Sequence, residues 1–126
     1  MGQTINPLGK KIIKVETDFC GKTLCLEVGR VGFRTSASVI ARYGDTVVLA
    51  SAMVGDKPLQ GFDYFPLSID YEEKMYAAGK ISGSRFIKRE GRPSDDAILI
   101  GRLIDRPIRP LWPKGYRHEV QGVATV

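Results

Sequence analysis

The sequence has few of the residues that build disulfide or metal sites. Its 126 residues include two cysteines, Cys20 and Cys25, and one histidine, His118. Because no histidine cluster accompanies the two thiols, they support neither a disulfide framework nor a zinc site. No nucleophile–base pair, acid–base pair or metal-ligand spacing is evident either. The residues alone therefore predict no catalytic residue and no metal ligand in this chain.

Long apolar runs are also missing. No stretch approaches the roughly 18 apolar residues that a membrane span requires, and the first residues, MGQTINPLGKK, lack the apolar core of a signal peptide. These absences predict a cytoplasmic protein without a membrane partner. With 126 residues, 43% of them hydrophobic, the chain can form one small domain with a core, over residues 1–126.

Positive charge is concentrated in one part of the chain. Residues 74–117 contain eleven Lys or Arg and four Asp or Glu, a local charge of +7. Residues 1–73 contain eight cations and nine acids, a charge of −1. The distribution predicts a polyanionic partner that contacts residues 74–117 rather than the whole surface.

Short runs of β-branched and apolar residues separated by turn residues predict a β-rich first half. The expected strands cover residues 11–17, 23–28, 37–43, 46–53 and 67–71. Gly44-Asp45 suits a tight turn between the third and fourth strands. The fourth, TVVLASAM, has almost no polar side, so we expect a central strand covered on both faces.

One amphipathic helix is expected after these strands. Ser94 has the features of an N-cap, with Asp95 and Asp96 in the first turn. Pro107 disfavours the helical conformation at the preceding residue, so the helix should end near Asp105. Its packing face should contain four apolar residues at helical spacing: Ala97, Ile100, Leu103 and Ile104.

Strand-like alternation resumes at residues 118–126, for which the sequence offers no obvious strand partner. Several strands, one helix and a further strand predict an α+β domain that is truncated.

The basic segment before the helix has two interpretations. Phe86 lies among Arg85, Lys88 and Arg89, and an aromatic ring between cations can stack on a base while the cations bind phosphates of single-stranded nucleic acid. Alternatively, Phe86 and Ile87 pack into the core and the cations are a solvated rim. The GKISGS run at residues 79–84 is likewise either a backbone cradle for phosphate or a surface loop.

Three further cations, Arg102, Arg106 and Arg109, fall within eight residues. They either line one side of a nucleic-acid channel or form ion pairs with the nearby acids. The four acids of this segment are too few to neutralise all of its cations.

Residues 90–116, EGRPSDDAILIGRLIDRPIRPLWPKGY, closely resemble the first RNase PH-like domain of the bacterial polynucleotide phosphorylase family. Residues 43–54, YGDTVVLASAMV, and residues 62–84, FDYFPLSIDYEEKMYAAGKISGS, are similar to it too. The resemblance extends from about residue 21 to residue 126. It implies an RNase PH-like fold, also called ribosomal protein S5 domain 2-like, in which a helix packs on a mixed sheet. Residues 1–126 would be the N-terminal portion of that domain, without the second RNase PH-like, KH and S1 domains.

The resemblance also implies an activity. The family degrades single-stranded RNA, including mRNA, from its 3′ end with inorganic phosphate as co-substrate and Mg²⁺ as cofactor, and it releases nucleoside diphosphates. Its members are homotrimers, and RNA degradosome components are expected as further partners. The metal and phosphate ligands lie chiefly in the second domain, so this segment would contribute RNA grip and trimer assembly rather than the catalytic centre.

The RNA-gripping loop of the family reads Phe-Phe-Arg-Arg, which matches Phe86, Ile87, Lys88 and Arg89 here. Ile87 offers no π face and Lys88 lacks the planar fork of arginine. Four arginines are expected to add supporting charge: Arg92, Arg102, Arg106 and Arg109.

Two alternatives remain. The chain could be a free-standing RNA-binding module, or an RNase PH-type enzyme that trims tRNA. The RPIRPLWP run at residues 106–113 argues against the second.

Overall fold

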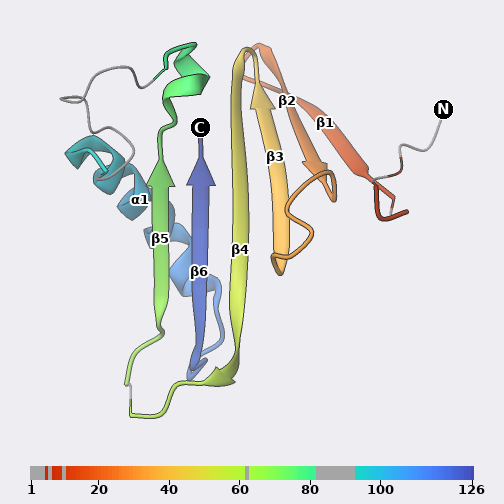
Figure 1. The fold of residues 1–126 in the computed structure, drawn as a ribbon. Helices are drawn as coiled ribbons and strands as arrows, with labels where there is room; N and C mark the ends of the chain where they lie inside the picture. The colour runs from red at the N-terminus through yellow and green to blue at the C-terminus, as the bar shows by residue number, and fades with distance from the viewer. Residues whose placement is uncertain (1–4, 6, 10, 62, 82–92) are drawn as a thin grey trace.

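A computed structural model of the chain describes residues 5, 7–9, 11–61, 63–81 and 93–126. The strands are β1 (Ile13–Phe19), β2 (Lys22–Val28), β3 (Ala37–Tyr43), β4 (Thr46–Pro58), β5 (Leu67–Glu72) and β6 (His118–Thr125). One α-helix, α1 (Asp95–Ile108), and two short 3-10 helices, η1 (Met75–Ala78) and η2 (Arg109–Leu111), complete the fold (Figure 1). The five predicted strands of the first half are therefore confirmed, although β4 extends five residues further than expected.

All six strands form one sheet in the order β1-β2-β3-β4-β6-β5. Neighbouring strands are antiparallel except β5 and β6, which are parallel. The expectation that the last strand lacks a partner is wrong, because β6 lies between β4 and β5. A parallel pair needs a crossover connection, and the segment containing α1 provides it.

The ends of α1 show one confirmed and one wrong prediction. Ser94 is the N-cap, and its hydroxyl accepts a hydrogen bond from the backbone N–H of Ala97 at 3.2 Å. The helix does not end near Asp105 but continues to Ile108, with Pro107 in its last turn. So close to the C-terminal end of the helix, Pro107 costs it a single backbone hydrogen bond. The next turn still closes, because the N–H of Arg109 donates to the carbonyl of Asp105.

The face of α1 that packs on β5 is built from small residues. Ala97 and Gly101 are its buried positions, whereas Leu103, expected on this face, is 68% exposed. A Cβ atom added at Gly101 would lie 3.2 Å from the carbonyl oxygen of Ile69. The helix therefore approaches the β5 backbone too closely for a row of large side chains.

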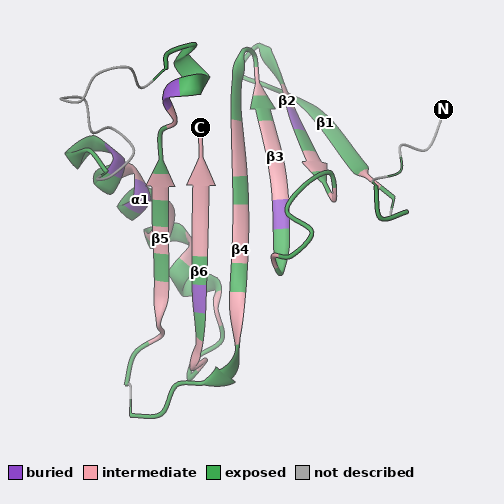
Figure 2. Ribbon diagram, in the orientation of Figure 1, coloured by how far each residue is buried: buried purple, intermediate pink, exposed green. Residues whose placement is uncertain are grey.

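The two faces of the sheet differ in character. The strand registers place most apolar residues of β1–β3 on the same face as Ile69, against which α1 packs, whereas β4 has apolar residues on both faces. In Figure 1, α1 lies behind β5 and β6 and leaves β1–β4 uncovered. The expectation that β4 is covered on both faces is therefore wrong for this chain: β4 is central, but none of its residues is buried (Figure 2).

Few residues of the described chain are fully enclosed. The buried apolar residues are Cys25, Met75, Ala97 and Val120. Both cysteines are free, with Cys20 exposed and Cys25 buried. Within the part of the chain that the structure describes, no helix has the length and apolar character needed to cross a membrane.

Candidate nucleic-acid interface

The predicted RNA-binding residues divide into two groups. Five of them lie outside the described residues: Phe86, Ile87, Lys88, Arg89 and Arg92. The structure places Arg102 and Arg106 on α1, and Arg109 at the start of η2.

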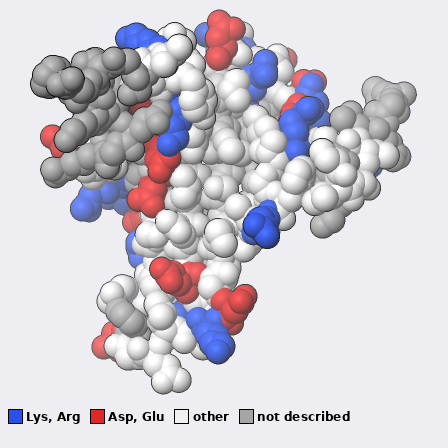
Figure 3. Space-filling model, in the orientation of Figure 1, with Lys and Arg blue, Asp and Glu red and all other residues white. Residues whose placement is uncertain are grey.

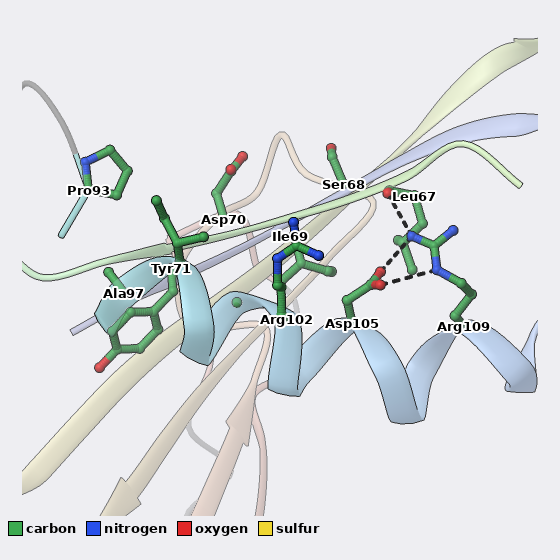
Figure 4. A pocket seen from close by; sticks show the side chains of 12 residues that line it. Leu67, Ser68, Ile69, Asp70, Tyr71, Pro93, Ala97, Arg102, Asp105 and Arg109 are labelled. Carbon is green, nitrogen blue, oxygen red and sulfur yellow. Dashed lines mark hydrogen bonds and ion pairs between the residues drawn. The ribbon is translucent and has the colours of Figure 1, made fainter. Parts of the chain in front are cut away.

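A cavity of about 320 Å³ separates α1 from β5 (Figure 4). Strand β5 contributes residues 67–71, and the chain just before α1 contributes Pro93. The helix side is lined by Ala97, Ile98, Gly101, Arg102, Asp105 and Arg109. Thus Arg102 and Arg109, two of the three predicted RNA-binding arginines that the structure describes, border the same cavity. They are seven residues apart, a spacing that places both on one side of a helix.

Arg109 is fully engaged by the fold. Its Nε and Nη2 donate to the two carboxylate oxygens of Asp105 at 3.1 and 2.8 Å. Its Nη1 donates to the carbonyl of Phe65 at 2.9 Å, and Nη2 also donates to the carbonyl of Leu67 at 3.1 Å. The guanidinium also lies 5.9 Å from the centre of the Phe65 ring. For Arg109, the ion-pair alternative raised by the sequence is confirmed.

Arg102 and Arg106 are in a different situation. Both are exposed, and neither forms an ion pair with any acid among the described residues. The side chain of Arg102 extends from α1 toward β5 beside Ile69 (Figure 4). An exposed arginine without a protein partner keeps its planar donors available for a phosphate.

Sequence reasoning missed Tyr71, which also borders the cavity and is half-buried. Burial raises the pKa of its phenol, and the nearby charge of Glu73 raises it further. Tyr71 therefore stays protonated at neutral pH and can donate a hydrogen bond. The alternation of β5 could have indicated this residue, since it places Tyr71 on the face of Leu67 and Ile69.

An aromatic cluster supports the far end of this region. The ring of Phe65 lies 5.1 Å from that of Trp112 and 5.6 Å from that of Tyr116. His118 extends the cluster, 5.3 Å from Tyr116, and its Nδ1 lies 2.8 Å from the carbonyl oxygen of Gly55. The cluster joins the chain after α1 to the segment before β5, which fixes the position of Arg109 relative to the sheet.

The family of the chain is shown by comparison with known proteins. Residues 21–126 match the RNase PH family, described as the 3′ exoribonuclease family, domain 1. The chain belongs to this family, and its mixed six-stranded sheet with one packed helix agrees with the predicted RNase PH-like α+β fold.

The relatives that it resembles are polyribonucleotide nucleotidyltransferases. That of Heliobacterium modesticaldum is 61% identical over 109 residues, which are 86% of this chain and 15% of the relative. That of Roseiflexus castenholzii is 54% identical over 116 residues, 92% of this chain and 15% of the relative. That of Staphylococcus aureus is 57% identical over 112 residues, 89% of this chain and 16% of the relative. The chain thus spans about one-sixth of the length of the relatives it matches.

Proposed function

We propose that this chain is part of a phosphorolytic 3′-to-5′ exoribonuclease acting on single-stranded RNA. In this reaction an oxygen of inorganic phosphate bonds to the phosphorus of the terminal diester, the 3′ oxygen of the preceding nucleotide leaves, and a nucleoside diphosphate is released. The observation that supports the proposal is the identity of 54–61% with polyribonucleotide nucleotidyltransferases over about nine-tenths of the chain.

The proposed role of this segment is to bind RNA and help assemble the trimer. Residues 74–117 have a charge of +7, and this part includes Arg102 and Arg106, two arginines of α1 that have no acidic partner among the described residues. We propose that they bind RNA phosphates, together with Phe86, Ile87, Lys88, Arg89 and Arg92. Arg109 would act indirectly, since its guanidinium is already committed to Asp105 and two backbone carbonyls.

Magnesium and inorganic phosphate belong to the proposal for the whole enzyme. Among the described residues, no group of three or more His, Cys, Asp or Glu side chains is arranged to hold a metal ion. We propose no magnesium ligand among these described residues, and we propose that the catalytic centre lies outside this segment. A homotrimeric assembly, degradosome partners and a cytoplasmic location are parts of the same proposal.

The alternative of an RNase PH-type tRNA-trimming enzyme is less favoured, because the relatives reported above are all polyribonucleotide nucleotidyltransferases. A free-standing RNA-binding module makes the same RNA contacts but has no phosphorolytic parent. The two are distinguished by testing whether the gene encodes further domains of the relatives.

The direct test is binding of a fluorescent oligo(A) across a salt series, while ADP release is followed in phosphate and Mg²⁺. The variants are Phe86→Ala and Lys88→Ala/Arg89→Ala. The matched control is Arg34→Ala/Lys57→Ala, which removes two exposed cations outside residues 74–117.

We expect binding to weaken with salt and with both variants but not with the control, and no ADP to appear. Equal losses in the variants and the control would show that only diffuse charge is involved. ADP release would place catalytic residues within this chain, contrary to the proposal.

A further inference from the structure

A second cavity lies on the opposite side of the sheet from α1. It is lined mainly by β1–β3, and strands β4 and β6 separate these from β5, which borders the cavity that contains Arg102. The volume of the second cavity is about 750 Å³, and it opens over β1, β2 and β3. Its polar rim includes Lys14, Glu16, Lys22, Glu27, Arg30 and Arg42. The RNA-binding proposal above uses none of these residues.

The strand registers place Lys14, Glu16, Glu27 and Arg42 on one face of the sheet, whereas Lys22, the first residue of β2, is paired with Phe19 and borders the cavity at the end of the strand. Glu16 is paired with Cys25, and Cys25 in turn is paired with Arg42, which gives one cross-strand row. Directly paired residues in adjacent strands project to the same side of the sheet. Figure 3 views this side of the sheet, and Lys and Arg side chains mixed with acids gather over β1–β3 at the upper right.

Both acids that line the cavity are already paired. Nζ of Lys14 lies 2.7 Å from Oε1 of Glu16, and Nε of Arg30 donates to Oε2 of Glu27. The hydrogen bond from Lys14 and its charge lower the pKa of Glu16, so that this carboxylate is ionised at neutral pH and balances its own partner. Lys14 and Arg30 thus neutralise both carboxylates that line the cavity.

Lys22 and Arg42 have no acidic partner among the described residues. Nζ of Lys22 lies 5.8 Å from the centre of the Tyr43 ring, a contact that leaves its three donors free. The lining therefore contains four cations against two acids, a net charge of +2. Two unneutralised cations over one open cavity favour an anion.

We propose that this cavity binds a phosphate-bearing ligand. The guanidinium of Arg42 would donate two parallel hydrogen bonds to phosphate oxygens, and Lys22 would supply a second positive charge. The hydroxyl of Thr23, which also lines the cavity, offers a neutral donor. Ile40 and Val47 give the floor an apolar part on which a base or a ribose can rest. The same chemistry is presented by a nucleoside diphosphate and by the backbone of RNA.

The test is titration of the 126-residue chain with ADP, followed by the backbone amide shifts of Thr23, Cys25 and Gly44. Arg42→Gln and Lys22→Gln remove the two free charges, and Arg34→Gln and Lys57→Gln are matched controls at exposed cations that do not line the cavity. We expect saturable shifts, weakened about tenfold or more by Arg42→Gln, as for loss of a charge-assisted bidentate contact. The controls should change the affinity less than about twofold.

Two results overturn the proposal. One is the absence of saturable shifts at these amides in wild-type protein. The other is an equal weakening by Arg42→Gln and Arg34→Gln, which indicates diffuse electrostatic attraction. Because Arg42 and Lys22 are exposed, the variants should keep the dispersed amide spectrum of the folded chain.

Competition identifies the source of the phosphate. Oligo(A) without terminal phosphates displaces ADP if the cavity accepts backbone phosphates, and fails to do so if it requires a terminal phosphoryl group; either outcome supports an anion site. The inference does not rest on the proposed function. Arg102→Gln should leave ADP shifts at Gly44 unchanged, so failure of RNA binding at α1 and failure of this site are separately visible.

Discussion

Arg109 and Asp105 form a two-pronged ion pair across one turn, with Nε–Oδ2 and Nη2–Oδ1 distances of 3.1 and 2.8 Å. The same guanidinium donates to the carbonyls of Phe65 and Leu67. Five N–H donors in a fixed plane can satisfy this set, which three donors on a single nitrogen cannot. Arg109 therefore joins the end of α1 to the start of β5.

Arg109→Lys should destabilise the chain although it conserves charge. Lysine cannot reach the carboxylate and both carbonyls together, so a loss of about 1–2 kcal/mol in the free energy of unfolding is expected for this partly exposed site. Urea unfolding gives the measurement. Arg106→Lys is the control, because Arg106 is exposed and forms no ion pair with a described acid; it should stay within about 0.5 kcal/mol of wild type. Similar midpoints for the two variants would contradict a bridging role for Arg109.

The order of the elements could be predicted from the sequence because their signals are local. The run at residues 37–43 and the N-cap Ser94 are found as expected, since alternation and capping depend on near neighbours. The helix end and the place of β6 could not be predicted in the same way. Arg109 is stabilised by carbonyls 42 and 44 residues away, and β6 pairs with β4 through a long connection.

The candidate interface shows the same division. Composition located the basic segment, and residue type identified its arginines as phosphate ligands or ion-pair partners. Neither could decide which arginine has which role. The role depends on the side of α1 from which the side chain projects and on backbone acceptors at the start of β5 and just before it. The structure separates Arg109, which is engaged, from Arg102, which has no described acidic partner.

Gly101→Ala should also destabilise the chain, although alanine is the better helix former. The new Cβ would lie 3.2 Å from the carbonyl oxygen of Ile69, a backbone atom that cannot rotate away. Overpacking of about 1–3 kcal/mol should exceed the gain of up to about 1 kcal/mol in helix propensity.

Gly55→Ala is the matched control for this experiment. A Cβ there would be 3.6 Å from its nearest neighbours, an ordinary contact distance. We expect it to be neutral or to stabilise by up to about 1 kcal/mol, through the unfolded state. A Gly101→Ala variant as stable as Gly55→Ala would show that α1 can move away from β5 at little cost.

Tyr71→Phe should change the alkaline limb of the stability curve. Burial raises the pKa of Tyr71 in the folded chain, so the unfolded chain loses this proton first as the pH rises. The titration of Tyr71 therefore leaves the free energy of unfolding unchanged below about pH 10 and lowers it as the pH rises through the pKa of the folded chain. The phenylalanine variant should lack this component.

Urea unfolding between pH 8 and pH 11 measures the effect, with absorbance at 295 nm to follow phenolate formation. The stability difference between wild type and Tyr71→Phe should be constant up to about pH 10 and then shift in favour of the variant. Parallel curves over the whole range would mean that the phenol titrates as it does in the unfolded chain.

Arg102 and Arg106 should differ from Arg109 in how they affect the salt dependence of RNA binding. Each phosphate contact that is removed should lower the slope of log K against log salt by about 0.7 for a single strand. We expect that decrease for Arg102→Gln and for Arg106→Gln measured with oligo(A). The charge of Arg109 is already paired with Asp105, so Arg109→Gln, measured under conditions where the variant is folded, should change the slope less than either.

An unchanged slope in Arg102→Gln would show that its guanidinium does not contact RNA phosphates and that residues 85–92 make the contacts. The slope is the informative quantity because a mutation that merely loosens the fold lowers affinity at every salt concentration, whereas loss of a phosphate contact changes the number of counterions released.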